Sequence, residues 1–272
     1  MLLLLFIFTG CTDKEELNKN QANVSPSSFI EGNKESINMK YELCKQDNYE
    51  IIRFSADKKK YKPKFLKGGS GDHQYIDYDE INIPIGKSRV GGPVVDLPED
   101  IEYPEDMYFA AQFNLQEFSK YDKNDLLPDT GFLYIFVDDS LEGKVVYSNC
   151  DINQLRRVIK EHSGQFSEGC LIEHFDMDIE NIKDKYDEEW ARDGEELGWN
   201  CFEGFDKSKF FGLYNNCQLG EAEMLEIING TKVLLVQIGE NFTGEGILSV
   251  LIEEEDLNKK EFENCVVEWS QS

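Results

Sequence analysis

The sequence predicts an α+β fold: duplicated antiparallel β-sheet units with short flanking helices, preceded by a disordered N-terminal tether. Segments rich in β-branched and aromatic residues recur between turns that contain glycine or proline, which is typical of strands joined by short connections. Three landmarks of the first half return in the second half, which indicates a repeat. The first 40 residues show no such pattern.

The N-terminal residues indicate an exported protein. The apolar run over residues 2–8 is too short to span a bilayer, which takes about 20 residues. Thr9 and Gly10 then precede Cys11, and small residues before a cysteine are typical of bacterial lipoprotein signals. We therefore expect a signal peptide over residues 1–10, lipidation of Cys11 and an anchor in a membrane of the bacterial cell envelope. A plain secretory signal or a buried N-terminal strand is the alternative.

The next segment is polar. Residues 12–40 are rich in Asn, Ser, Glu and Lys, a composition that cannot bury enough apolar surface to fold. With Cys11 they predict a lipidated tether over 11–40, and residues 41–272 are expected to form the folded domain.

In the first unit, at about 85–150, the pattern alternates between strand and short helix. Residues 109–113 predict a buried strand, 115–121 one or two helical turns, and 131–137 a central strand. Residues 144–147 are expected to pair with that strand as a hairpin. A helix is predicted over 151–160, with Asp151 as its N-cap.

The second unit, at about 205–270, repeats these landmarks. The offsets are 120 (Gly92 to Gly212), 125 (Gln112 to Gln237) and 115 (Gly131 to Gly246), which predicts an internal duplication. Chance similarity between apolar strands is the alternative, because strands use few residue types. A short helix at 256–262 and a last strand at 264–269 complete the unit.

The charge balance excludes one class of partner. The chain carries 28 basic and 54 acidic residues, a formal net charge of −26. Such a surface repels nucleic-acid phosphates, whereas it attracts and steers a basic protein. The alternative is that the acidity serves solubility alone.

At its landmarks the sequence resembles the YwqG-like family of bacterial proteins, over about residues 41–269. The matching residues include Gly91, Gly92, Pro93, Gln112, Asn114, Gly131, Asp138, Gly212, Gln237 and Asp256. The family's proline after Gly212 is replaced by Leu213. The resemblance implies an α+β domain of antiparallel sheets without a settled enzymatic activity, and it assigns no role to these residues. Members are often encoded near secreted toxin systems, which implies immunity or binding roles.

These observations favour a membrane-anchored, monomeric, acidic protein that binds a basic partner and neutralises it if the partner is a toxin. An envelope lipoprotein with a structural or housekeeping role is the first alternative. A carboxylate-dependent enzyme that uses Asp138 and Asp139 is the second. Because no nucleophile elbow, catalytic triad or metal-binding histidine pair occurs, we predict no catalytic residue and no cofactor.

Two weaker patterns concern metals and disulfides. Acidic residues at 176, 178, 180, 184 and 187 fit a calcium-loop template, but Asn181 replaces its glycine, so a solvated acidic face is expected and no metal. Of the seven cysteines, Cys170, Cys201 and Cys217 are the expected participants in one or two disulfides.

The glutamines Gln112 and Gln237 leave two interpretations open. If the duplication is real, their amides could converge on one groove between the sheets. The alternative is that each amide satisfies a main-chain group at a sheet edge.

Overall fold

The computed structural model describes residues 47–57, 60–61, 65–67, 74–76, 83–185, 198, 200 and 203–271. The predicted signal peptide, Cys11 and the tether over 11–40 lie outside the described residues. Within the described part, antiparallel sheets dominate and the helices are few and short, which confirms the α+β class.

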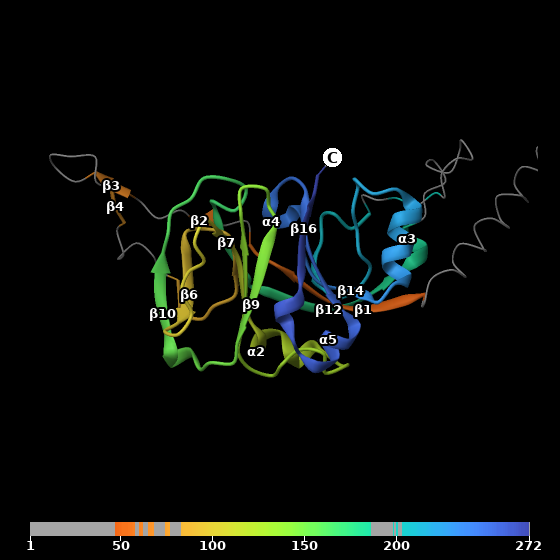
Figure 1. Cartoon of the computed structure of the whole chain (residues 1–272), viewed down its shortest axis with the longest axis horizontal. Helices are drawn as coiled ribbons and strands as arrows, with labels where there is room; N and C mark the ends of the chain where they lie inside the picture. The colour runs from red at the N-terminus through yellow and green to blue at the C-terminus, as the bar shows by residue number, and fades with distance from the viewer. Residues whose placement is uncertain are drawn as a thin grey trace, which may run out of the picture. The chain divides into compact units, whose positions relative to one another are not determined.

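Two six-stranded antiparallel sheets form the body of the domain (Figure 1). The first contains, in spatial order, β12 (His174–Asn181), β1 (Asn48–Ser55), β13 (Ser208–Phe210), β14 (Lys232–Ile238), β15 (Ile247–Glu253) and β16 (Val266–Ser270). The second contains β2 (Lys60–Tyr61), β11 (Gly169–Leu171), β5 (Arg89–Val90), β7 (Tyr108–Asn114), β8 (Phe132–Val137) and β9 (Gly143–Ser148). Two ribbons pair β10 (Leu155–Ile159) with β6 (Val94–Pro98), and β3 (Phe65–Lys67) with β4 (Gln74–Ile76).

Short helices follow the strands. They are α2 (Leu115–Phe118), α3 (Glu221–Asn229), α4 (Glu240–Thr243) and α5 (Glu254–Lys259), with 3₁₀ turns η2 (Ser119–Tyr121), η3 (Ile152–Gln154), η4 (Ile182–Lys185) and η5 (Phe262–Asn264). The predicted strands at 109–113, 131–137 and 264–269, the hairpin partner at 144–147 and the helical turns at 115–121 are confirmed. No described helix is long and apolar enough to cross a membrane.

One face of each sheet contributes to a single apolar core. Because side chains alternate along a strand, Phe54 of β1 and Phe210 of β13 face the same side as their neighbours in that sheet, and Phe113 of β7 meets them from the other sheet. The ring centroids of Phe54 and Phe113 lie 5.4 Å apart, and those of Phe113 and Phe210 lie 5.0 Å apart. Strands β9 and β16 also lie side by side (Figure 1).

The two sheets share a strand order, β5–β7–β8–β9 and β13–β14–β15–β16, and an irregularity. The register shifts between Phe109 and Ala111 in β7, and between Leu234 and Val236 in β14. At each bulge the main-chain oxygen of the extra residue, Ala110 or Leu235, accepts a hydrogen bond from the residue that follows the short partner strand. These matches are what a duplication would produce, and duplication as their origin stays a prediction.

The predicted helix over 151–160 is wrong. Only the 3₁₀ turn η3 precedes β10, which pairs along its length with β6. Arg157 of β10 forms an ion pair with the buried Asp96 of β6 at 2.9 Å, and Leu155 and Val158 pack on the apolar cluster beneath. Pairing with another strand therefore overrides the helical spacing of the apolar residues.

The disulfide expectation needs correction, and so does the solvated acidic face expected at residues 176–187. Residues 174–181 form β12, in which Asp176 is exposed but Glu180 is buried, and residue 187 lies outside the described residues. Cys217 is a free thiol whose Sγ lies 3.2 Å from Ser270 Oγ. Cys150 and Cys265 are free as well, and Cys201 lies outside the described residues.

Candidate functional site

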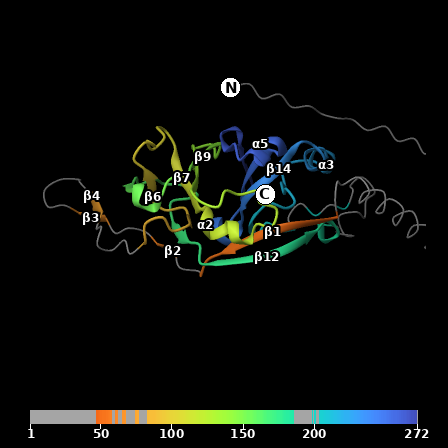
Figure 2. The ribbon, with the colours of Figure 1, turned by 90° about the horizontal axis from the view of Figure 1, so that it is seen from below.

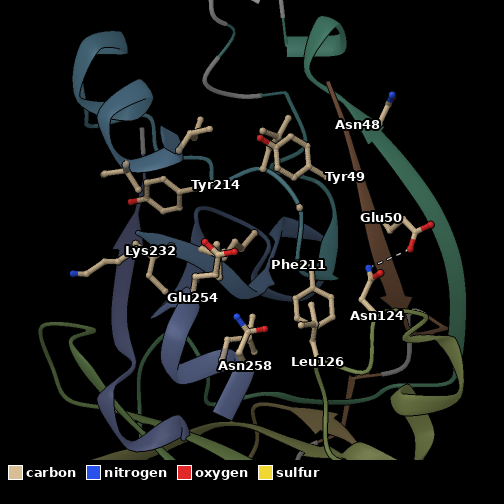
Figure 3. A pocket seen from close by; sticks show the side chains of 18 residues that line it. Asn48, Tyr49, Glu50, Asn124, Leu126, Phe211, Tyr214, Lys232, Glu254 and Asn258 are labelled. Carbon is tan, nitrogen blue, oxygen red and sulfur yellow. Dashed lines mark hydrogen bonds between the residues drawn. The ribbon is translucent and has the colours of Figure 1, made fainter. Parts of the chain in front are cut away.

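A groove of about 400 Å³ opens among β1, β14, β15, α3, α5 and the loops at 122–127 and 211–214 (Figure 3). Its floor is apolar and consists of buried leucine side chains: Leu213, Leu234, Leu251 and Leu257. Pockets that hold small ligands or single anchoring side chains have volumes of about 300–1,000 Å³ and mostly apolar walls. The groove therefore has the size and lining of a binding site.

The rim of the groove carries an excess of negative charge. The described lining has two acidic residues, Glu50 of β1 and Glu254 of α5, and one basic residue, Lys232, while Lys123 Nζ lies 4.0 Å from Glu50 Oε1 outside the lining. The Asn124 amide donates to Glu50 Oε2 at 3.3 Å, the bond drawn in Figure 3. Glu254 is the first residue of α5, and its N–H donates to Thr231 O at 2.8 Å, which fixes the switch from the loop into the helix.

Aromatic rings line the same opening. Tyr49, Phe211 and Tyr214 all border the groove (Figure 3). Burial and the hydrogen bond to the Glu268 carboxylate raise the pKa of Tyr214 well above its usual range, so its phenol stays neutral. Rings beside carboxylates bind cations through the negative ring face and direct charge attraction. No histidine or cysteine is among the described residues that line the groove.

A buried ion pair holds one wall of the groove. Lys209 Nζ lies 2.7 and 2.6 Å from the two carboxylate oxygens of Glu180 and donates to Leu213 O at 2.9 Å. Glu180 in turn accepts from the N–H of Leu213 at 2.7 Å. Burial by itself would raise the pKa of Glu180, but Lys209 and Lys185 outweigh it and lower that pKa below its usual range. The pair therefore fixes the main chain of the loop at 211–214.

A second buried lysine extends this network. Lys185 Nζ donates to Glu203 O and to Asn215 Oδ1, and it lies 3.9 Å from Glu180 Oε1. Burial, together with the neighbouring charge of Lys209, lowers the pKa of Lys185 to about 7. The amide of Asn215 donates to Gln237 Oε1 at 3.0 Å, which joins the network to β14.

The other sheet has a corresponding network around Arg89. This fully buried guanidinium lies 2.5 Å from Asp96 Oδ2, and Asp96 also binds Arg157. Gln112 Oε1 accepts from Arg89 Nη2 at 3.1 Å and from the N–H of Asp96 at 2.9 Å. Burial raises the pKa of Asp96, but Arg89 and Arg157 lower it by more, so the carboxylate is charged.

Comparison with known proteins gives a family without an assigned activity. A family model described as a domain of unknown function, DUF1963, matches residues 88–270, more than half of the chain. The chain belongs to the DUF1963 family. No curated protein matches it significantly. The matched region begins one residue before β5 and ends with β16, so it includes β5, β7, β8 and β9 of one sheet and β13 to β16 of the other.

Half of the ten predicted site residues, all of which lie in the DUF1963 region, shape the main chain. Gly91, Gly92, Gly131 and Gly212 have φ values of +66°, +82°, +96° and +92°, a region that favours glycine, and Pro93 follows the first turn. Of the ten predicted residues, only Gly212 lines the groove among the residues the structure describes.

The predicted carboxylates and Asn114 act as local caps. Asn114 Oδ1 accepts from the N–H of Gln116 at 3.2 Å, at the start of α2. Asp138 Oδ1 accepts from the N–H groups of Ser140 and Glu142, which holds the turn between β8 and β9. Asp256, in the first turn of α5, accepts from the Asn264 amide at 3.1 Å.

The two glutamines lie on interior strands, and each amide nitrogen donates to main-chain oxygens of the loop that leads into the neighbouring short strand. Gln112 Nε2 donates to Lys87 O at 3.2 Å, and Gln237 Nε2 donates to Lys207 O at 2.7 Å and Gly204 O at 2.9 Å. Neither side chain lines the groove. Their contacts match the backbone-satisfying interpretation, although the strands are central and not at an edge.

Sequence reasoning missed the groove carboxylates and the buried lysines. One signal was available: Lys209 stands between Ser208 and Phe210 in a segment that otherwise predicts a buried strand. A charged residue at such a position needs a buried partner, and Glu180 is that partner.

An exposed trio is the one described group with the composition of a metal site. The ligand atoms of Asp57, Glu173 and His174 lie within 4.8 Å of one another. His174 Nε2 already lies 3.0 Å from Asp57 Oδ1. All three residues are exposed, and exposed acidic groups of this kind are common without a bound ion.

Proposed function

We propose that this protein is a membrane-anchored, acidic binding protein that captures a basic partner, and that the partner is a secreted toxin that the protein neutralises. The observation that carries the proposal is the groove, in which three aromatic rings and two carboxylates surround an apolar floor. In a basic side chain flanked by apolar residues, the positive charge would lie beside the carboxylates and aromatic rings, and the apolar residues would contact the apolar floor.

Long-range charge supports the same partner. The formal net charge of −26 would raise the rate of encounter with a basic protein at low ionic strength and repel acidic ones. Screening by salt acts mainly on this encounter, while contacts inside the groove are screened less.

The proposed anchor places the groove near the membrane. A lipid on Cys11 and a flexible spacer to about residue 40 would give the domain a reach of roughly 30 Å from the envelope membrane. A protein held there meets an incoming toxin before the toxin reaches its target. The resemblance to YwqG-like proteins, often encoded near secreted toxins, supports this choice of partner, and a monomer suffices for it.

The test uses the full chain purified in detergent and two fluorescent peptides, Gly-Leu-Arg-Leu-Gly and Gly-Leu-Glu-Leu-Gly. We expect the arginine peptide to bind more tightly, and Glu50→Gln and Glu254→Gln each to weaken it about fivefold, the effect of losing about 1 kcal/mol of charge attraction. The matched control is Glu105→Gln, an exposed residue outside the groove. Equal binding of the two peptides, or no effect of either groove variant, would contradict the proposal.

A further inference from the structure

Strand β12 forms an open edge of the sheet. It pairs with β1 over eight consecutive residues, from His174 to Asn181. In the sheet order it comes at the end, and Figure 2 shows it on the outer side of β1. Within the part of the chain that the structure describes, no strand pairs with its other side. Such an edge presents unpaired main-chain groups to a partner.

The hydrogen-bond pattern shows which residues present those groups. Ile182 N donates to Asp47 O at 2.9 Å, so by the two-residue period of an antiparallel ladder the N–H groups of Asp176, Asp178 and Glu180 point to β1. The N–H and C=O groups of Phe175, Met177 and Ile179 therefore point outward. Consistent with this, the N–H of Ile179 is bound by the neighbouring Asp178 carboxylate at 2.8 Å and not by β1.

The two faces of the strand differ in chemistry. On one face are Phe175, Met177 and Ile179, and the Ile179 side chain is 60% exposed although it is a large apolar residue. On the other face are the exposed Asp176 and the half-exposed Asp178. A strand added beside β12 would therefore have apolar residues on one face and basic residues on the other.

Charge decides between a partner and a second copy of this chain. Two β12 strands placed edge to edge would bring Asp176 and Asp178 of both copies together, and like charges on adjacent strands are destabilising. A strand with lysine or arginine at alternate positions would instead pair with Asp176, and with Asp178 in exchange for its ion pair to Arg53 at 2.8 Å. Edge strands that are protected against pairing commonly carry charged residues or proline. The exposed apolar Ile179 is not such a protecting residue.

We propose that β12 is a docking edge for an extended segment of the basic partner, in which apolar and basic residues alternate. The segment adds antiparallel to β12, as every pair in this sheet is antiparallel. This inference rests on the proposed function, because it concerns the same partner. It adds a second contact beside the groove, since Glu50 in the groove rim lies opposite Ile179 in the register.

The test measures binding of the fluorescent peptide Lys-Val-Lys-Val-Lys-Val-Lys to the full chain. In an antiparallel addition the valines lie opposite Phe175, Met177 and Ile179, so the valine N–H groups face β12 and the lysine N–H groups face solvent. We expect N-methylation of the valines to weaken binding at least tenfold and N-methylation of the lysines to change it little. Both methylated peptides have the same charge, so the comparison isolates main-chain pairing.

Variants of the edge give a second readout. Met177→Pro removes an outward N–H from the middle of β12 without entering the ladder to β1, a position where an edge strand tolerates proline. We expect it to weaken binding of the unmodified peptide at least tenfold while circular dichroism stays native. Asp176→Asn with Asp178→Asn should weaken the peptide several-fold, and Glu105→Gln should not.

The outcomes separate the two proposals. Equal binding of the two methylated peptides, or failure of the unmodified peptide to bind, would overturn the docking edge. A dimer in light scattering that Met177→Pro dissociates, with no peptide binding, would also overturn it and assign the edge to a second copy. Tight binding of the lysine–valine peptide, together with equal binding of Gly-Leu-Arg-Leu-Gly and Gly-Leu-Glu-Leu-Gly, would support the edge and remove the groove as the carrier of the proposed function.

Discussion

Gln112 and Gln237 occupy the same register position in the two sheets, each opposite a fully buried cation on the neighbouring strand. Gln112 lies opposite Arg89, and Gln237 lies opposite Lys209. Each amide nitrogen donates to the main-chain oxygen two residues before that cation, at 3.2 and 2.7 Å. The two glutamines therefore have the same structural role: each provides a hydrogen-bond partner for main-chain groups at the start of a short strand.

The first prediction concerns these amides. Gln112→Leu and Gln237→Leu each keep the approximate volume but leave several buried polar groups without partners, so each should destabilise the fold by about 2–4 kcal/mol. Urea unfolding measures the change. Gln116→Leu, at an exposed position, is the control and should change the free energy of unfolding by less than about 0.5 kcal/mol. A change that small at Gln112 or Gln237 would show that its hydrogen bonds contribute little.

The second prediction is a pH dependence from Lys185. Its pKa falls to about 7 in the folded state, below the usual value of 10.5 that it regains on unfolding. Between these two values the unfolded chain binds more protons, so stability should rise with pH from about 7 towards 10.5, with a slope approaching 1.4 kcal/mol per pH unit. Below pH 7 both states bind the proton and this slope disappears.

Lys185→Met tests this origin. The variant should lose the additional slope between pH 7.5 and 9.5 in urea unfolding, whatever its absolute stability, because it has no titrating amine. Lys259→Met, at an exposed position of α5, should retain the slope. Parallel pH profiles for the wild type and Lys185→Met would assign the pH dependence to other groups.

Sequence patterns predicted the elements whose neighbours are close along the chain. The hairpin of β8 and β9 and the strand at Ile247–Glu253 follow from apolar density and turn residues. The groove did not follow, because its walls come from β1, α3 and α5, whose residues are far apart in the chain. The Glu180–Lys209 pair likewise joins residues 29 positions apart, on β12 and β13, which β1 separates in the sheet, and no local period encodes such a contact.

The misassigned segment at 151–160 shows the limit of periodicity. Leu155, Val158 and Ile159 have the spacing of a helical face, but the segment pairs with β6. In that pairing Arg157 Nε donates to Oδ1 of the buried Asp96, 61 residues away, which also binds Arg89. Such long-range charge pairing cannot be predicted from a short window of sequence.

The third prediction concerns Gly212 in the wall of the groove. A Cβ at this position would lie 2.6 Å from Glu180 Oε2 and 2.6 Å from Ile51 Cγ2, and the residue has a φ of +92°. Gly212→Ala should therefore both strain the main chain and displace the carboxylate that holds Lys209, with a loss of more than about 2 kcal/mol in stability.

Gly244→Ala is the matched control, because Gly244 has a similar φ of +79° but nothing within 4 Å of its added Cβ. Gly244→Ala should lower the free energy of unfolding by only about 1 kcal/mol, because alanine is less stable than glycine in this left-handed conformation. Binding of Gly-Leu-Arg-Leu-Gly should weaken in Gly212→Ala and stay unchanged in Gly244→Ala. If the two variants lose the same stability, the contact with Glu180 does not shape the loop at 211–214.

The fourth prediction tests the proposed anchor separately from binding. Cys11→Ala removes the only side chain that a lipoprotein pathway could acylate at this position, so the protein should move from the membrane fraction to the soluble fraction of the cells that make it. Mass spectrometry of the wild type should show cleavage before Cys11 and the added mass of acyl chains. Because the groove lies within the described domain, Cys11→Ala should bind Gly-Leu-Arg-Leu-Gly as tightly as the wild type. A soluble wild type with an unmodified Cys11 would refute the anchor while leaving the groove and the β12 edge to be judged by their own variants.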